Sequence, residues 1–121
     1  MNTKVLGKVG EHLALEYLKN KGFVVIATNH RNKMGEIDLI MKDKNVLVFI
    51  EVKARVVSAI SSPEDALTPR KLKKLQLLTR VYVFENKWLG PYRIDAVCIV
   101  YSRGLEPQSI RHYKDILAHG F

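Results

Sequence analysis

The stretch that decides the fold is GEIDLIMKDKNVLVFIEVKAR, residues 35–55. Two runs rich in β-branched and other apolar residues, EIDLIM and VLVFIEV, flank the polar residues 43–45, a composition typical of two strands joined by a turn. The stretch therefore predicts a β-hairpin. Its strands also carry charged side chains, which are costly to bury unless they are paired; these are Glu36, Asp38, Glu51 and Lys53.

Strand geometry brings these charged residues together, because alternate side chains of a strand point to the same face. Glu36 and Asp38 share one face, and Glu51 and Lys53 share one in the next strand. A short turn then places Asp38 opposite Glu51. By the same register, Glu36 lies opposite Lys53. A slip by one residue would place Asp38 beside Ile50 and mix charge with the core, so the apolar pattern favours the first register.

Two facing carboxylates indicate a metal site. Like charges directly opposite are destabilising, and such a pair responds by raising one pKa or by sharing a cation. Mg²⁺ or Mn²⁺ suits Asp38 and Glu51, because these ions take carboxylate oxygens and keep other positions for water and phosphate. Lys53 would then stabilise negative charge that develops at a phosphorus atom attacked by water. The alternative is a structural ion pair, in which Lys53 binds Glu36 or Asp38.

The composition is that of a globular chain. With 121 residues, 47% of them hydrophobic and 26% charged, the sequence fits one domain, residues 1–121. No apolar run reaches the roughly 18 residues of a membrane helix, and charged residues interrupt any signal-peptide pattern. Cys98 is the single cysteine, which excludes an internal disulfide and a thiolate zinc cluster. We therefore expect a cytoplasmic protein without a membrane segment.

Basic residues outnumber acidic ones by 20 to 12, which gives a formal net charge of +8. Such an excess is expected of a protein that binds the phosphate backbone of nucleic acid, although ribosome-associated and membrane-surface proteins share it. The candidates for sequence-independent phosphate contacts flank the hairpin strands or gather at the start of the second predicted helix. They are Arg31, Lys33, Arg55, Arg70, Lys71 and Lys74.

Helix and strand patterns surround the hairpin. Thr3 and Gly22 are typical of the two ends of a helix, and Thr68 followed by Pro69 is typical of a helix start. A strand returns to the sheet after the second helix, as a crossover connection requires, so we expect an α/β fold in which helices flank a mixed β-sheet. The predicted elements are helices over 3–21 and 69–86, strands over 23–28, 36–41, 46–52 and 92–101, and a tail, 108–121, that forms a strand, a short helix or both.

Other polar and aromatic residues are expected to be mainly structural. Arg93 and Asp95 share a strand face and are expected to pair. The four histidines have no metal-ligand spacing and are interpreted as incidental. Trp88 and Tyr92 flank a Gly-Pro pair, where hydrophobic packing is favoured over stacking on a base.

Several motifs resemble those of a known family. GEIDLI and FIEVKAR look like the Asp…Glu-x-Lys core of the PD-(D/E)XK nuclease superfamily, and the whole chain is similar to the bacterial YraN family, which is related to archaeal Holliday junction resolvases. The similar segments, in order, are GKVGEHLALEYLKNKGF, NHR, GEIDLI, FIEVKAR, PEDALTPRKLKKL and YRIDAV. The resemblance implies a restriction-endonuclease-like fold with a metal site at Asp38, Glu51 and Lys53. Glu11 matches the acidic residue that resolvases contribute from their first helix, whereas its spacing alone fits equally well a helix carboxylate paired with a lysine.

The sequence therefore predicts a metal-dependent endonuclease, or a nuclease-like nucleic-acid-binding protein, that acts on structured or branched DNA by phosphodiester hydrolysis. Asp38 and Glu51 would bind Mg²⁺ or Mn²⁺. Lys53 would stabilise the transition state or position water, and Glu11 would assist from the helix. Because resolvases of this kind act on two strands as dimers, the resemblance also implies a homodimer. One alternative is a non-catalytic nucleic-acid-binding module that retains the nuclease fold, and another is an assembly scaffold with a structural ion-pair cluster.

Overall fold

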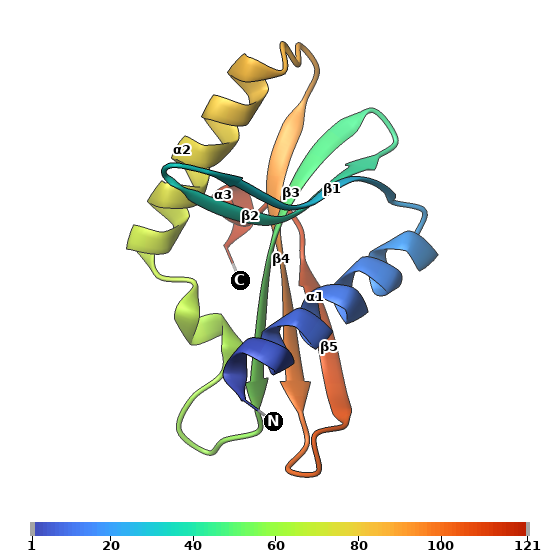
Figure 1. Ribbon diagram of the computed structural model, residues 1–121, viewed down its shortest axis with the longest axis vertical. Coiled ribbons are helices and arrows are strands. Elements are labelled where there is room, and N and C mark those ends of the chain that lie inside the picture. The colour runs from blue at the N-terminus through green and yellow to red at the C-terminus, as the bar shows by residue number, and fades with distance from the viewer. Residues whose placement is uncertain (1, 121) are drawn as a thin grey trace.

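The computed structural model describes residues 2–120, and this part of the chain forms one five-stranded sheet in the order β1-β2-β3-β4-β5, with helices packed on it (Figure 1). β1, β2 and β3 pair antiparallel, β4 runs parallel to β3, and β5 pairs antiparallel with β4. The predicted mixed α/β fold is therefore confirmed. The elements are α1 Thr3–Asn20, β1 Val24–Asn32, β2 Gly35–Asp43, β3 Val46–Val56, the 3-10 helix η1 Pro63–Ala66, α2 Pro69–Glu85, β4 Tyr92–Tyr101, β5 Pro107–Tyr113 and α3 Ile116–His119.

The helix ends follow local sequence signals. α2 begins as predicted, with Pro69 at its first position and the Lys71 N–H donating to Oγ1 of Thr68 at 3.2 Å. The cap of α1 is Asn2, whose Oδ1 accepts from the Val5 N–H at 2.9 Å, and not the predicted Thr3. The tail forms both a strand and a short helix. Within residues 2–120, no helix is both long and apolar enough to span a membrane.

The two long helices cover opposite faces of the sheet, as the view in Figure 1 suggests and the two apolar clusters confirm. In β3, Val48 and Ile50 pack into the cluster that contains α1 residues. Leu47 and Phe49 pack into the cluster that contains α2 residues. The strand period of two therefore directs Glu51 toward the α2 face. The Glu51 carboxylate therefore lies on the face of β3 that α2 covers.

The two hairpin strands separate just where the charged residues begin. Their ladder runs from Asp43↔Val46 to Leu39↔Ile50, which is the predicted register. The N–H of Val52 then donates to the Oδ2 of Asp38, at 2.8 Å, in place of a backbone carbonyl. β2 continues beyond this point paired with β1 alone, with Glu36 beside Arg31 and not opposite Lys53. The separation leaves a fork between β2 and β3.

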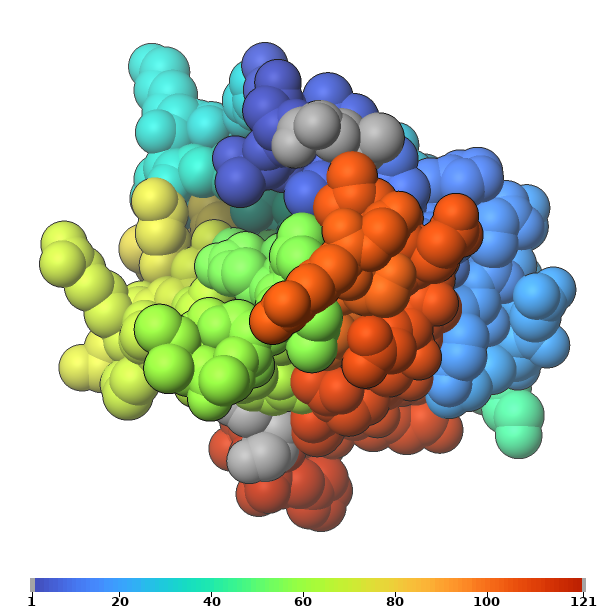
Figure 2. All heavy atoms as spheres, turned by 90° about the horizontal axis from the view of Figure 1, so that it is seen from below, coloured from blue at the N-terminus to red at the C-terminus, as the bar shows by residue number. Residues whose placement is uncertain are grey.

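α1 closes one side of the fork because it approaches β3 closely. A Cβ on Gly10 would lie 3.1 Å from the Cβ of Ala54, so only a glycine fits here without movement. The hydroxyl of Tyr101 donates to the Leu6 carbonyl at 2.9 Å and holds the same part of the helix. At the lower end of the molecule, shown in Figure 2, the start of α1, the loop after β3 and the turn between β4 and β5 gather. The close approach places Glu11, the residue after Gly10, at the fork.

Candidate active site

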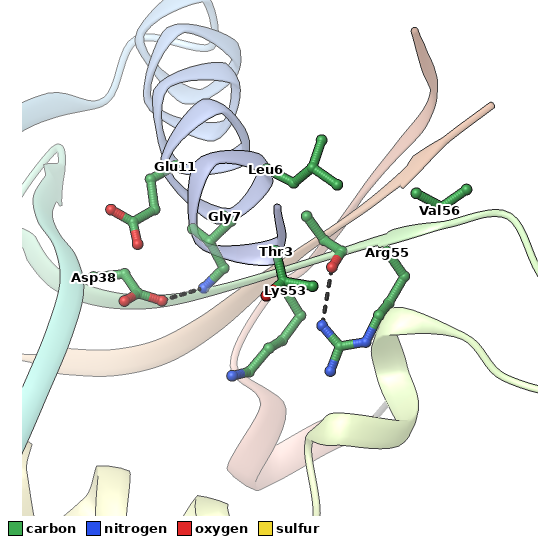
Figure 3. A pocket seen from close by; sticks show the side chains of 10 residues that line it. Thr3, Leu6, Gly7, Glu11, Asp38, Lys53, Arg55 and Val56 are labelled. Atoms are coloured by element: carbon green, nitrogen blue, oxygen red, sulfur yellow. Dashed lines mark hydrogen bonds between the residues drawn. The ribbon is translucent and has the colours of Figure 1, made fainter. Parts of the chain in front are cut away.

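Three carboxylates meet at the fork. Glu11 from α1 and Glu36 and Asp38 from β2 each place one carboxylate oxygen within 4.8 Å of the others. Glu11 and Asp38 line a cavity of about 640 Å³, together with Lys53 and Arg55 of β3. Figure 3 shows the Glu11 and Asp38 carboxylates close together, with the Lys53 side chain running from β3 away from α1. The structure therefore brings together three of the four predicted catalytic side chains around one cavity.

The fourth, Glu51, does not line the cavity and is buried, with 2% of its side chain exposed. Burial, a hydrogen bond to Glu51 and the charge of Glu51 together raise the pKa of Asp38 to about 9. A pKa raised this far favours the protonated form of Asp38 at neutral pH. This is one of the two responses expected of facing carboxylates.

Lys71, in the first turn of α2, is the cation closest to the buried carboxylate in the described part of the chain. Its Nζ lies 2.8 Å from Oε2 of Glu51. Burial disfavours the charged ammonium, yet the bond to Glu51 keeps the pKa of Lys71 above its ordinary value. The Oε2 atom has no hydrogen bond of regular geometry among residues 2–120, so the contact is an ion pair. Lys71 was predicted as a surface contact to nucleic acid, and the structure instead places it half-buried within the site.

Asn29 fixes the positions of two of the carboxylates. Its Nδ2 donates to Oε1 of Glu11 at 2.7 Å and to Oε1 of Glu36 at 2.9 Å. Its backbone has a φ of 50°, a left-handed conformation that asparagine tolerates better than most residues. The guanidinium of Arg31 donates to the other oxygen of Glu36, and these bonds lower the pKa of Glu36. Glu11 also lies 3.6 Å from the ammonium of Lys8, so the helical pairing left open by the sequence is present as well.

Sequence reasoning missed Asn29 and the bridging position of Glu36. The available signal was the polar run NHRN, residues 29–32, with which β1 ends.

The other predicted phosphate contacts lie around the cavity and on α2. Arg55 lines the cavity and donates to the Ala54 carbonyl, and Arg31 is 74% exposed although it pairs with Glu36. The remaining three side chains are exposed: Lys33, Arg70 and Lys74. Their contact with nucleic acid stays a prediction.

Comparison with known sequences identifies the family. The family model described as "Uncharacterised protein family UPF0102" matches residues 10–99. The chain belongs to UPF0102. The matched range contains every carboxylate of the site, as well as Asn29, Lys53 and Lys71. Membership of UPF0102 agrees with the YraN resemblance, while a relation to PD-(D/E)XK nucleases stays a prediction.

Relatives within UPF0102 span nearly the same length. A UPF0102 protein of Herpetosiphon aurantiacus is 42% identical over 118 residues, which cover 93% of this chain and 94% of that protein. One from Renibacterium salmoninarum is 41% identical over 110 residues, 89% of this chain and 93% of the relative. One from Clostridium botulinum strain Hall is 40% identical over 101 residues, 80% of each chain.

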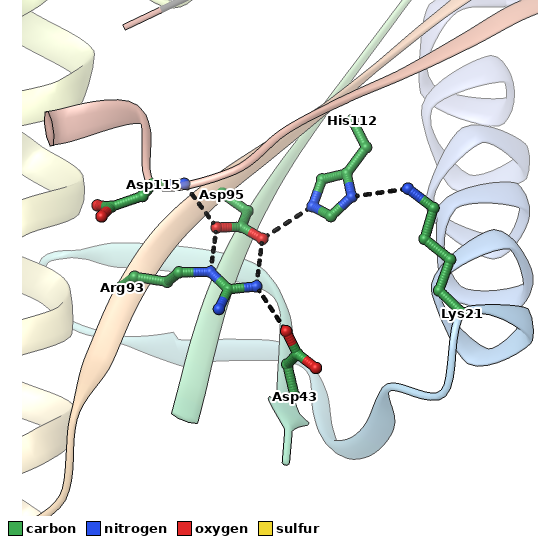
Figure 4. Close-up of polar contacts among 6 residues, drawn as sticks. All are labelled: Lys21, Asp43, Arg93, Asp95, His112 and Asp115. Carbon is green, nitrogen blue, oxygen red and sulfur yellow. Dashed lines mark hydrogen bonds and ion pairs between the residues drawn. The ribbon is translucent and has the colours of Figure 1, made fainter. Parts of the chain in front are cut away.

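A second polar cluster in this UPF0102 chain lies away from the cavity, around Asp95 (Figure 4). Arg93 Nε donates to Oδ1 of Asp95 at 2.9 Å, so the predicted pair is confirmed. His112 has 2% of its side chain exposed and places Nε2 2.8 Å from Oδ2 of Asp95, with the Nζ of Lys21 3.2 Å from its other ring nitrogen. Burial opposes the charge of Asp95, but bonds from His112 and Arg93 lower its pKa. Interpreting His112 as incidental was therefore wrong, because it joins β5 to β4 and to the end of α1.

Proposed function

We propose that the chain is a metal-dependent nuclease that hydrolyses phosphodiesters in structured or branched DNA, with a restriction-endonuclease-like relationship to the PD-(D/E)XK proteins. The observation that carries the proposal is the meeting of three carboxylates, Glu11, Glu36 and Asp38, at the fork between β2 and β3. Glu51 interacts with Asp38 from β3, and Lys53 lines the same cavity as Glu11 and Asp38. These residues come from one helix and two strands, and the strands give up regular pairing where they meet. A purely structural ion pair would not need three carboxylates within 4.8 Å of one another.

The residues fit a hard divalent ion. The candidate metal-ligand atoms at the fork are carboxylate oxygens, the ligands that Mg²⁺ and Mn²⁺ prefer. Burial and the nearby Glu51 raise the pKa of Asp38, as expected of facing carboxylates without a cation between them, and Oε2 of Glu51 has no regular hydrogen bond among residues 2–120. Asp38 and Glu51 would hold the ion, with Glu11 beside them. When bound, the ion supplies electrostatic stabilisation to the phosphate oxygens.

The remaining residues support this chemistry. Lys53 of β3 lines the cavity, and its ammonium would stabilise charge on the phosphate or orient the attacking water. Asn29 holds the Glu11 carboxylate toward Asp38. Exposed basic residues near the cavity would bind the sugar-phosphate backbone without reading sequence. Two copies of the chain in a homodimer would present two such sites to a branched substrate.

One observation favours a second candidate function. The Lys71 ammonium already lies 2.8 Å from Glu51 and balances its charge without a metal ion. A chain that binds nucleic acid and performs no hydrolysis would need nothing more. In that case, neutralising Asp38 or Glu51 would leave binding unchanged or tighten it, because repulsion of phosphate would fall.

The test is hydrolysis of labelled four-way, flapped and single-stranded DNA with Mg²⁺ or Mn²⁺, by the wild type, Asp38→Asn, Glu51→Gln and Lys53→Met. The proposal expects each variant to lose about 100-fold or more in rate, the size of effect typical of a lost electrostatic group. Glu16→Gln is the matched control, because Glu16 is an exposed carboxylate of α1 that pairs with Lys19. Equal rates in the wild type and the site variants would show that any cleavage comes from elsewhere.

A further inference from the structure

The turn between α2 and β4 presents an exposed aromatic surface, which we call the α2–β4 corner: Arg80, Phe84, Lys87, Trp88, Leu89 and Tyr92. These residues line an open groove of about 410 Å³. Phe84 is 84% exposed, Leu89 98% and Tyr92 42%. Large apolar side chains that are exposed together mark an interaction site more often than those scattered singly.

Trp88 is fixed at the base of the groove by several contacts. The Nε1–H of Trp88 donates to the Pro91 carbonyl at 3.0 Å. The Trp88 ring lies against Gly90, where a Cβ would come within 2.9 Å of it. Trp88 also packs on the apolar cluster beneath α2, which explains the predicted packing role. The Tyr92 ring meets the buried Phe49 ring edge to face, at 6.0 Å between centroids, and still leaves 42% of Tyr92 exposed. Phe84 is not part of that cluster, so packing there does not account for its exposed ring.

The charges around the groove indicate its partner. Arg80 and Lys87 line it, and the Nζ of Lys42 lies 5.4 Å from the centre of the Trp88 ring. A second copy of the chain is disfavoured, because a two-fold interface would set these cations against the same cations. A partner that suits the surface combines negative charge with flat apolar faces. Single-stranded nucleic acid has both, since proteins bind it with basic grooves and aromatic side chains on which bases stack.

We propose that the α2–β4 corner binds single-stranded nucleic acid, with an unpaired base stacked on Phe84 and Tyr92 over Trp88 and with phosphates bound by Arg80 and Lys87. α2 connects this corner to the candidate active site, because Lys71 in its first turn contacts Glu51. At about 1.5 Å per residue, Phe84 lies about 20 Å along the helix from Lys71, which is about six stacked nucleotides. The position of the corner relative to a cleaved bond rests on the proposed function, and the binding itself does not.

The sequence contains one tryptophan, so its fluorescence reports on the corner alone. We would titrate the wild type with a single-stranded oligothymidylate of about 12 nucleotides and with an abasic sugar-phosphate oligomer of equal length, both with a metal chelator present. The inference expects the thymidylate to quench Trp88 and to bind at least about fivefold more tightly than the abasic oligomer. Phe84→Ala and Phe84→Leu should each lose about fivefold or more in affinity. Leu77→Ala, at an exposed residue of the same helix outside the groove, should match the wild type.

Equal binding of the two oligomers, or unchanged affinity in Phe84→Ala, would overturn the inference. The inference would also be overturned if an acidic, phenylalanine-containing peptide of the same net charge as the thymidylate displaced it and bound the corner more tightly than the thymidylate does. That result would indicate a protein partner. Quenching that grows with protein concentration without nucleic acid would indicate a second copy instead and would equally refute it. Asp38→Asn keeps the corner intact: if it and the wild type cleave no DNA but both show the thymidylate quenching, the hydrolysis proposal fails and the corner inference stands.

Discussion

Replacing Asp38 by asparagine should stabilise the metal-free protein at neutral pH, because asparagine imitates the protonated acid. Its side-chain oxygen can accept from the Val52 N–H as Asp38 does, and its amide can donate to Glu51. The groups that face this position are Glu11 on α1, Glu51 on β3 and Lys71 on α2. The substitution leaves all three in place and removes the proton equilibrium.

The magnitude follows from the pKa of Asp38, which burial and Glu51 raise from 3.8 to about 9. The folded state binds a proton that the unfolded state releases, so the stability from this group is complete below the unfolded pKa and is lost as the pH rises toward the folded one. The loss is at most about 1.4 kcal/mol per pH unit. Between about pH 5 and pH 7, the free energy of unfolding of the wild type should therefore fall by about 2 to 3 kcal/mol relative to that of Asp38→Asn.

Urea denaturation of both proteins at several pH values in this range, with a chelator present, measures the difference. Glu16→Gln serves as the control, since that carboxylate is exposed on α1. A difference between Asp38→Asn and the wild type that does not change with pH would refute the reasoning, because Asp38 would then not hold a proton in the folded protein.

Three other predictions test the surroundings of the site and the frame of the fold. Asn29→Gly keeps the left-handed backbone and removes the side-chain amide that holds Glu11. Calorimetry should then show about 10- to 100-fold weaker Mn²⁺ binding, and unchanged binding would contradict this role of Asn29. Asp95→Asn removes the buried carboxylate charge that Arg93 pairs with and leaves Arg93 only its ion pair with Asp43. It should lower the free energy of unfolding by about 3 kcal/mol in urea, and a loss below about 1 kcal/mol would show that the cluster is not a structural anchor. Hydrogen bonds from Arg111 are the main cause that lowers the pKa of Glu64 to about 2, so the stability that Glu64 contributes is present above the unfolded pKa of 4.5 and is lost as the pH falls toward 2. Glu64→Gln should therefore flatten the dependence of the free energy of unfolding on pH between these values. An unaltered pH dependence would contradict this role of Glu64.

The parts of the structure that the sequence predicted are those with local causes. The hairpin register follows from the apolar alternation within residues 35–55, and the start of α2 follows from adjacent Thr68 and Pro69. The facing of Asp38 and Glu51 was predictable because only a short turn separates their strands.

The parts that the sequence did not predict depend on contacts between distant segments. The Lys71–Glu51 pair requires the start of α2 to lie beneath β3, and nothing in a run of lysines shows which of them turns inward. The contact between Lys21 and His112 joins residues 91 positions apart. Asn29 acts through a backbone φ of 50°, which a strand-like pattern does not reveal.

The most direct test of the central claim is a calorimetric titration of Mg²⁺ and Mn²⁺ into the wild type, Asp38→Asn and Glu51→Gln, repeated with branched DNA that carries a non-hydrolysable phosphate linkage. The account predicts ion binding by the wild type that disappears in both variants, because each removes a carboxylate of the fork. Equal heats in all three proteins, or no binding by the wild type even with DNA present, would contradict the assignment of this fork as a metal site.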